Sequence, residues 1–268
     1  MIPRGLIGVV HLPPLPGDPL APEGRDWNDA EHFALADADA LAQGGVDALL
    51  VENFGSAPFA KGTAGARTPP HTVAFLALLL GKLQRHGLPL GVNCLRNDAH
   101  SALGIAAAAG ADFIRVNVHT GAYVTDQGVI EGEAHDTLRY RRSLGAENVA
   151  LLADVLVKHA KPLAPITPED ATRDCVHRGL ADAVIVTGEA TGAPVSPTLL
   201  ERVAAAAAPA PVLIGSGLTP DNAEALVPLA KGAIVGTWLK QDGVVHAPVD
   251  QARVETLAQL VHNRWRRD

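Results

Sequence analysis

Cysteine and aromatic residues are scarce in this chain of 268 residues. The two cysteines, Cys94 and Cys175, are too few for a disulfide framework and lack the paired spacing of a zinc site. This usage is typical of a reducing cytoplasm, which is the expected location. Aromatic residues make up 4% of the chain, fewer than a surface that stacks on single-stranded nucleic acid would need.

Positive charge and long apolar runs are limited too. Lys and Arg number 22 against 29 Asp and Glu, a net charge of −7, so no nucleic-acid or anionic-membrane partner is expected, whereas a local cationic pocket stays open. The apolar start is interrupted at Pro13 and Pro14, and the longest strongly apolar stretch, Val73 to Leu80, is followed by Gly81. Neither run suffices for a signal peptide or a membrane span, so no integral membrane segment is expected.

Short aliphatic runs, in contrast, are abundant. Hydrophobic residues make up 47% of the chain, which excludes disorder as the dominant state. Runs rich in Val, Ile and Leu alternate with Ala- and Leu-rich amphipathic stretches, a pattern typical of buried parallel strands joined by crossover helices. The candidate strands are Leu6–Val10, Ala48–Val51, Leu90–Asn93, Phe113–Val116, Ala150–Ala153, Ala183–Val186, Val212–Ile214 and Ala233–Val235.

These runs predict the α/β class and a single (β/α)₈ TIM barrel. Eight strands close such a barrel, and the chain length is near the roughly 250 residues typical of one. Glycine-to-aspartate phrases such as Gly110-Ala111-Asp112 precede several runs and are typical of turns from helix to strand. No linker or low-complexity tract divides the chain, so one domain over residues 1–268 is expected rather than two smaller domains.

Polar residues follow the predicted strands where a barrel places its active site, at the carboxyl ends. The candidates there are His11, Glu52, Asn53, Asn93, Arg115, Asn117, Asp154, Lys158 and His159. Each taken alone is equally well explained as a helix cap or a loop hydrogen-bonder. Charges beside apolar strands are harder to explain in that way, because an unpaired buried charge is costly.

Arg115 illustrates this cost. Strand alternation places Arg115 and Asn117 on one face of their strand. If Arg115 points into the barrel it needs a carboxylate, which Glu52 or Asp154 can supply. A structural ion pair and an anchor for an anionic substrate both remain open.

Two glycine-rich turns form the most specific local signal. Gly215, Ser216 and Gly217 lie between a strand and a helix start marked by a threonine cap and a proline, and Gly236 with Thr237 ends the next strand. Barrels often bind phosphate between these last two loops, so the turns predict a phosphate site to which Lys240 would add charge. Alternatively, the glycines only permit tight turns.

Two longer connections, Phe54–Arg67 and His119–Glu133, are interpreted as covers over the site, with surface insertions as the alternative.

Six motifs resemble the BtpA/SgcQ family over nearly the whole chain. They are His11–Gly17, Val51–Gly55, Gly91–Asp98, Phe113–Val118, Ala153–His159 and Gly215–Gly217. The resemblance implies a barrel similar to the ribulose-phosphate-binding barrels and a phosphate site. The family takes its name from a role in photosystem I biogenesis in cyanobacteria, and other members look like sugar-metabolism proteins. It implies no particular reaction and no agreed set of catalytic residues.

The first functional hypothesis is an enzyme, a lyase, isomerase or hydrolase, that acts on a small phosphorylated sugar or related metabolite. Glu52 and Asp154 would be general acid and base with raised pKa values. Lys158 would stabilise an oxyanion or form a Schiff base, while His11 and His159 move protons. No cofactor is expected, although a divalent metal held by Glu52, Asp154 and His159 stays open, as does assembly into a homo-oligomer.

The second hypothesis is a non-catalytic factor that assembles a membrane complex such as photosystem I. It predicts an exposed apolar patch or a membrane-seeking amphipathic helix. The segment from Asp250 to Arg267 is the candidate, with apolar residues at helical spacing and Arg264, Arg266 and Arg267 at its end. The last barrel helix, whose basic end complements its dipole, is the favoured interpretation of that segment.

Overall fold

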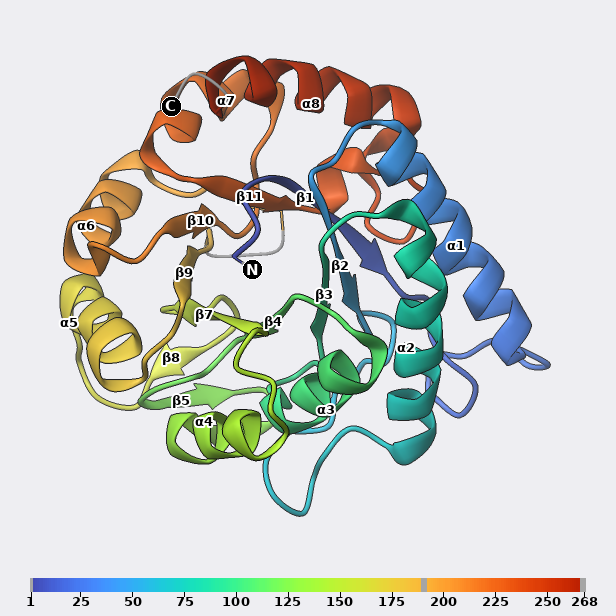
Figure 1. Ribbon diagram of the computed structural model, residues 1–268, viewed down its shortest axis with the longest axis horizontal. Helices are drawn as coiled ribbons and strands as arrows, with labels where there is room; N and C mark the ends of the chain where they lie inside the picture. The colour runs from blue at the N-terminus through green and yellow to red at the C-terminus, as the bar shows by residue number, and fades with distance from the viewer. Residues whose placement is uncertain (1, 189–191, 266–268) are drawn as a thin grey trace.

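Eight parallel strands close into a barrel in the computed structural model, which describes residues 2–188 and 192–265 (Figure 1). Around the barrel they are β1 (Gly5–His11), β11 (Gly232–Val235), β10 (Val212–Ile214), β9 (Ala183–Val186), β7 (Ala150–Val155), β4 (Phe113–Val116), β3 (Leu90–Asn93) and β2 (Ala48–Glu52). The predicted (β/α)₈ barrel is confirmed. The longest extension beyond a predicted strand is in β7, which continues to Val155.

Helices surround the barrel as an outer ring (Figure 1). They are α1 (Trp27–Gln43), α2 (Pro70–Leu83), α3 (Ala99–Ala109), α4 (Ala134–Ser143), α5 (Pro168–Arg173), α6 (Pro197–Ala207), α7 (Pro220–Leu226) and α8 (Gln251–Trp265). Short helical turns are η1 (Gln84–His86), η2 (Asp174–Arg178), η3 (Val227–Leu229), η4 (Thr237–Leu239) and η5 (Gln241–Gly243). Side-chain caps at Asp26, Asp98 and Ser196 satisfy N–H groups where α1, α3 and α6 begin.

The strands are buried on both faces, so their alternating side chains build two apolar cores. Leu6 and Val10 of β1 pack in the cluster that also contains helix residues, whereas Ile7 and Val9 belong to a smaller cluster of strand residues inside the barrel. Phe113 is the largest member of the inner cluster. A Cβ atom on Gly91 of the neighbouring β3 would lie 2.1 Å from its ring, so glycine there makes room for that ring.

Strand register aligns polar residues at the carboxyl ends of three adjacent strands. His11 of β1 pairs with Glu52 of β2, and Glu52 pairs with Asn93 of β3. The next two strands around the barrel after β3 bring Arg115 on β4 and Asp154 on β7. These side chains therefore emerge near one rim of the barrel.

A three-stranded antiparallel sheet lies beside this rim. Its strands are β5 (Ala122–Thr125), β6 (Gly128–Glu131) and β8 (Lys161–Pro162), in the order β6-β5-β8. The segment expected as a cover loop from His119 to Glu133 thus contains a hairpin, in which Tyr123 and Ile130 pair and are buried. Because β8 follows β7 and pairs with β5, the turn over residues 156–160 is anchored at both ends.

Helix α8 is the last barrel helix. Val254, Leu257 and Val261 on its apolar face are buried, and the helix contacts α1, α7 and β1. That face is therefore already covered by the barrel. Arg266 and Arg267, which were expected at the end of this helix, lie outside the described residues. Within residues 2–188 and 192–265, no helix is both long and apolar enough to cross a membrane.

Candidate functional site

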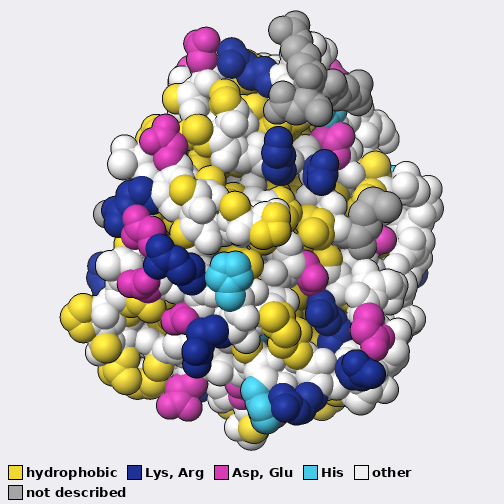
Figure 2. Space-filling model, turned by 60° about the vertical axis from the view of Figure 1, so that its left-hand side comes forward, with side chains coloured by type: hydrophobic (Ala, Val, Ile, Leu, Met, Phe, Trp, Pro, Cys, Tyr) yellow, Lys and Arg dark blue, Asp and Glu magenta, His cyan; other side chains and the backbone are white. Residues whose placement is uncertain are grey.

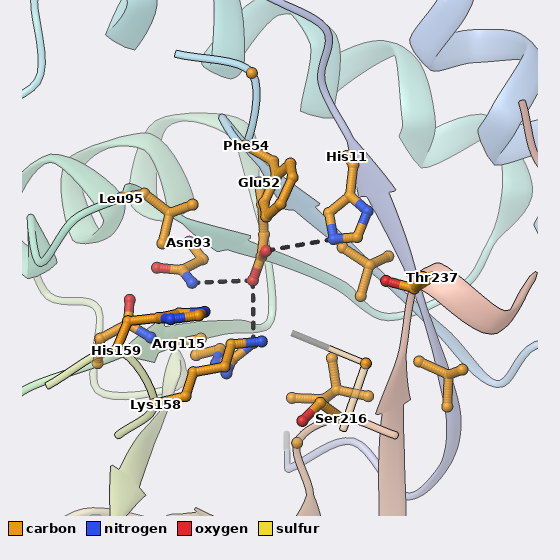
Figure 3. Close-up of a pocket in the computed structure, with 18 of the residues that line it drawn as sticks. His11, Glu52, Phe54, Asn93, Leu95, Arg115, Lys158, His159, Ser216 and Thr237 are labelled. Carbon is orange, nitrogen blue, oxygen red and sulfur yellow. Dashed lines mark hydrogen bonds and ion pairs between the residues drawn. The ribbon is translucent and has the colours of Figure 1, made fainter. Parts of the chain in front are cut away.

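A cavity of about 660 Å³ opens at the carboxyl ends of the strands (Figure 3). The residues expected at the site that line it are His11, Glu52, Asn93, Arg115, Asn117, Lys158, His159, Gly215, Ser216, Gly217, Gly236 and Thr237. Two expected residues, Asn53 and Asp154, are not among its lining residues. The cavity thus gathers side chains from strands on both sides of the barrel.

Arg115 holds two carboxylates together beneath the cavity. Its Nη1 donates to Glu52 Oε1 at 3.1 Å, while its Nε and Nη2 donate to the two oxygens of Asp154 at 3.2 and 3.1 Å. The side chains of Arg115, Glu52 and Asp154 are 5%, 7% and 0% exposed. Both carboxylates named as partners from the sequence therefore bind Arg115, whose charge is balanced within the protein.

Asp154 lies behind Arg115. Besides the two bonds from Arg115, it accepts a 2.7 Å hydrogen bond from Nδ2 of Asn117. Its position suits orientation of these two side chains rather than direct contact with a ligand.

Asn53 holds the chain after β3. Its Oδ1 accepts from the backbone N–H of Leu95 at 2.7 Å, and its Nδ2 donates to the carbonyl of Leu95 at 3.3 Å. With both ends of its amide occupied, Asn53 supports the site from outside the cavity.

Glu52 is ionised, although a raised pKa was expected from its burial. Burial raises the pKa of this carboxyl, but Arg115, His11 and a 3.0 Å hydrogen bond from Asn93 Nδ2 outweigh that effect and lower the pKa below its ordinary value. Glu52 therefore suits the acceptance of a proton, or the stabilisation of positive charge, better than proton donation.

His11 faces Glu52 across the cavity floor, with Nε2 3.7 Å from Glu52 Oε2 (Figure 3). Burial, only partly offset by Glu52, lowers the pKa of His11 to about 3, so the imidazole is neutral at pH 7. Phe54 packs at a ring distance of 4.6 Å. A Cβ on Gly236 would come within 2.4 Å of the imidazole, so the ring position requires glycine at 236.

Lys158 extends into the cavity from the turn after β7 (Figure 3). This turn contains two left-handed residues, Leu156 with φ 51° and His159 with φ 57°, and Arg96 Nη2 donates to the Lys158 carbonyl at 2.8 Å. Burial, followed by repulsion from Arg115, lowers the pKa of Lys158 to about 8. Such an amine donates to an oxyanion when protonated and attacks a carbonyl when neutral, so this position is compatible with both expected roles.

His159 also lines the cavity but is exposed. Burial and the nearby Lys158 and Arg96 lower its pKa, which favours the neutral ring.

The two glycine-rich turns form the opposite side of the cavity, where Ser216 and Thr237 face it (Figure 3). A Cβ on Gly217, which has φ +72°, would lie 2.1 Å from the carbonyl oxygen of Ala193. Packing alone therefore explains the glycine at position 217. The argument for a ligand comes instead from the position of both turns at the cavity. Helix α7 has seven residues and begins with a capping box between Thr219 and Asn222.

Lys240 does not contribute to this site, and the expectation that it would add charge to the phosphate site is wrong. Its ammonium pairs with Asp37, and its side chain is 1% exposed. Asp37 also accepts a 2.7 Å hydrogen bond from the N–H of Val249. Thr237 faces the cavity and begins the helical turn η4. Lys240, directly after η4, lies away from the cavity and pairs with Asp37 of α1.

Sequence reasoning gave too little weight to Arg96 and missed an apolar wall. Arg96 is buried at the cavity, three residues after β3. Phe59, Trp238 and His246 also line the cavity, and His246 packs at 5.8 Å from the ring of Phe54. The position of Arg96 shortly after a strand is the sequence feature that could have identified it. Phe59 and His246 lie in loops, whose path cannot be read from the sequence.

The exterior shows no comparable concentration of one charge on the face in Figure 2. Lys and Arg side chains there are interspersed with Asp and Glu and with small hydrophobic patches. This distribution is typical of a solvated surface rather than a footprint for an extended polyanion.

Comparison with known proteins identifies the family. The sequence model of the BtpA family matches residues 3–263 of this chain. The chain belongs to the BtpA family. Among relatives, the photosystem I biogenesis protein BtpA of Synechocystis is 48% identical over 96% of this chain and 87% of its own length. The putative sgc region protein SgcQ of Escherichia coli is 33% identical over 97% of this chain and 95% of its own length.

The fold of this BtpA-family chain also resembles solved barrel enzymes. N-(5'-phosphoribosyl)anthranilate isomerase from Pyrococcus furiosus matches with a TM-score of 0.56 and 13% identity, covering 97% of this chain and 99% of that chain. At that identity the likeness concerns the barrel fold alone.

The metal-ligand set considered for this BtpA-family chain does not assemble. Within the described ranges 2–188 and 192–265, no group of three or more His, Cys, Asp or Glu is arranged to hold a metal ion. Asp154 directs its oxygens to Arg115 and Asn117 instead.

Proposed function

We propose that this protein is an enzyme that acts on a phosphorylated sugar or a related phosphorylated metabolite at the carboxyl-end mouth of its barrel. The observation that carries the proposal is that one cavity is lined both by the two glycine-rich turns and by the ionised Glu52 with its neighbours. A barrel that only supported a surface would not need these costly buried charges.

The phosphate is proposed to bind at the turns after β10 and β11. Backbone N–H groups of Ser216 and Gly217 and the hydroxyls of Ser216 and Thr237 are the proposed donors. This is the side on which barrels commonly bind phosphate.

The chemistry is proposed to occur between Glu52 and Lys158, which approach the cavity from opposite directions (Figure 3). Glu52 accepts a proton from one atom of the ligand and, with neutral His11 beside it, returns that proton to another atom of the ligand; alternatively it stabilises a positively charged transition state. Lys158 donates to the oxygen on which negative charge develops. Arg115 and Asp154 position Glu52.

Calorimetry with matched sugars tests the phosphate site. Glucose 6-phosphate is expected to bind and glucose is not. Ser216→Asp should weaken binding of glucose 6-phosphate about tenfold or more, because it places a carboxylate beside the phosphate. Ser143→Asp, which adds the same charge at an exposed position at the end of α4, should leave the affinity unchanged.

Two results would overturn the proposal: no binding of phosphorylated sugars, or binding that Ser216→Asp leaves intact. The name of the Synechocystis relative raises the alternative of an assembly factor for a membrane complex, and that alternative predicts the first result. With a substrate that is turned over, Glu52→Gln should lower kcat by about 10² to 10⁴ while the affinity for the phosphate changes little.

A further inference from the structure

Arg96 and the glycine-rich turn at 215–217 lie on opposite sides of the barrel. In the closed order of eight strands, β3 and β10 are four places apart, which is half the circumference. Arg96 follows β3 and the turn follows β10. Both line the same cavity, so a ligand whose phosphate sits at the turn extends toward Arg96.

Within the described part of the chain, Arg96 and Lys158 form no ion pair, although Glu52 and Asp154 attract both from a greater distance. The Nη2 of Arg96 donates to the backbone carbonyl of Lys158. Among residues 2–188 and 192–265, no carboxylate lies within ion-pair distance of either Arg96 or the ammonium of Lys158. Arg115, in contrast, has its charge matched by two carboxylates. Arg96 and Lys158 are therefore the two cavity cations without an ion-pair partner in the described chain.

Burial of these two cations near each other and near Arg115 is unfavourable. Burial and the neighbouring arginines lower the pKa of Lys158 to about 8, and burial lowers the pKa of Arg96. Asp126 also lines this side, but it is exposed and accepts a 2.6 Å hydrogen bond from Gln127. An anionic group brought by the ligand would remove the repulsion and replace the lost hydration of both cations.

We propose that Arg96 and Lys158 bind a second anionic group of the ligand, a carboxylate or a second phosphate. The substrate class is then phosphorylated sugar acids or sugar bisphosphates rather than sugars with one phosphate. This inference rests on the proposed function, which supplies the first phosphate and its place at the opposite turn.

Two matched pairs of ligands test it by calorimetry: glucose 6-phosphate against 6-phosphogluconate, and fructose 6-phosphate against fructose 1,6-bisphosphate. At least one doubly anionic compound should bind about 10 to 100 times more tightly than its partner, the gain expected for charged hydrogen bonds. A gain confined to 6-phosphogluconate identifies a carboxylate as the second group. A gain confined to the bisphosphate identifies a phosphate.

Variants test which residues produce this gain in affinity. Lys158→Met and Arg96→Gln should each abolish most of it, so that the affinity for the doubly anionic compound falls about tenfold or more beyond any loss for the singly charged partner. The glutamine retains a donor for the carbonyl of residue 158. Lys161→Met, which removes an exposed lysine of β8 outside the cavity, is the matched control and should leave the gain intact.

The inference is overturned if neither doubly anionic compound gains affinity, or if Lys158→Met weakens both members of a pair equally. In these cases binding of glucose 6-phosphate that Ser216→Asp abolishes still supports the proposed function. Absence of binding by all four compounds overturns both.

Discussion

Replacing Arg115 with Met should destabilise the fold strongly and reverse the pH response of its stability. The variant keeps most of the side-chain volume but leaves Glu52 and Asp154 buried without their shared cation. Glu52 retains one hydrogen bond from Asn93, and Asp154 retains one from Asn117. Breaking a buried pair on one side costs about 3–5 kcal/mol, a large part of the roughly 5–15 kcal/mol that stabilises a typical domain.

The pH dependence distinguishes lost charge pairing from lost packing. In the native protein the pKa of Glu52 is lowered, so the stability it contributes is present above its unfolded pKa and is lost as pH falls through the folded pKa. In Arg115→Met, burial becomes the dominant influence and raises the pKa of Glu52. The folded variant then binds a proton more readily than the unfolded chain, and its stability rises as pH falls from 7 toward 5.

Urea denaturation followed by circular dichroism at pH 7 and pH 5 measures both effects. Arg139→Met is the control and should cost little, because among the described residues Arg139 makes one hydrogen bond, to the carbonyl of His135 in its own helix. Adding Asp154→Asn to Arg115→Met should recover part of the loss, because one buried charge disappears. A loss below about 1 kcal/mol at pH 7, or stability of the variant that does not rise between pH 7 and pH 5, would refute the reasoning.

Three further outcomes are expected. Lys240→Met should lower the free energy of unfolding by about 3–5 kcal/mol, because it leaves Asp37 buried and unpaired, yet calorimetry should show an unchanged affinity for glucose 6-phosphate. Gly91→Ala should cost about 1–3 kcal/mol in urea denaturation because its Cβ meets the ring of Phe113, and Phe113→Leu should lessen that cost when combined with it. The extra affinity for a doubly anionic ligand should fall between pH 7 and 9, since Lys158, with a pKa of about 8, loses its charge over this range. An affinity gain that is constant over this range would contradict the last expectation.

The barrel could be predicted because its strands are buried on both faces and therefore read as short aliphatic runs. The run Phe113–Val116, for example, has the same bounds in the sequence pattern and in the structure. The hairpin of β5 and β6 was missed for the opposite reason. The alternation of apolar and polar residues in this hairpin is short. Val124 and Val129 are apolar but exposed, and only Tyr123 and Ile130 among these four residues are buried.

Only the part of the candidate site that lies at the ends of strands could be predicted from the sequence. His11, Glu52 and Asn93 follow the rule because parallel register places them side by side. Whether a strand-end residue faces the cavity depends on the path of the chain beyond the strand, which no short pattern specifies. Asn53 and Lys240 both follow predicted strands, yet Asn53 bonds to Leu95 and Lys240 to Asp37. The lowered pKa of Glu52 depends on Arg115, which lies 63 positions away in sequence.

Closure of the barrel has a consequence for the size of molecule that the mouth accepts. Each strand is hydrogen-bonded to neighbours on both sides all the way round, so the separation between the ends of β3 and β10 is set by the backbone and not by mobile loops. A ligand that must reach both ends is therefore selected by its length as well as by its charge. Within a series of phosphorylated sugar acids of increasing carbon number, affinity should pass through a maximum at the length that spans the barrel.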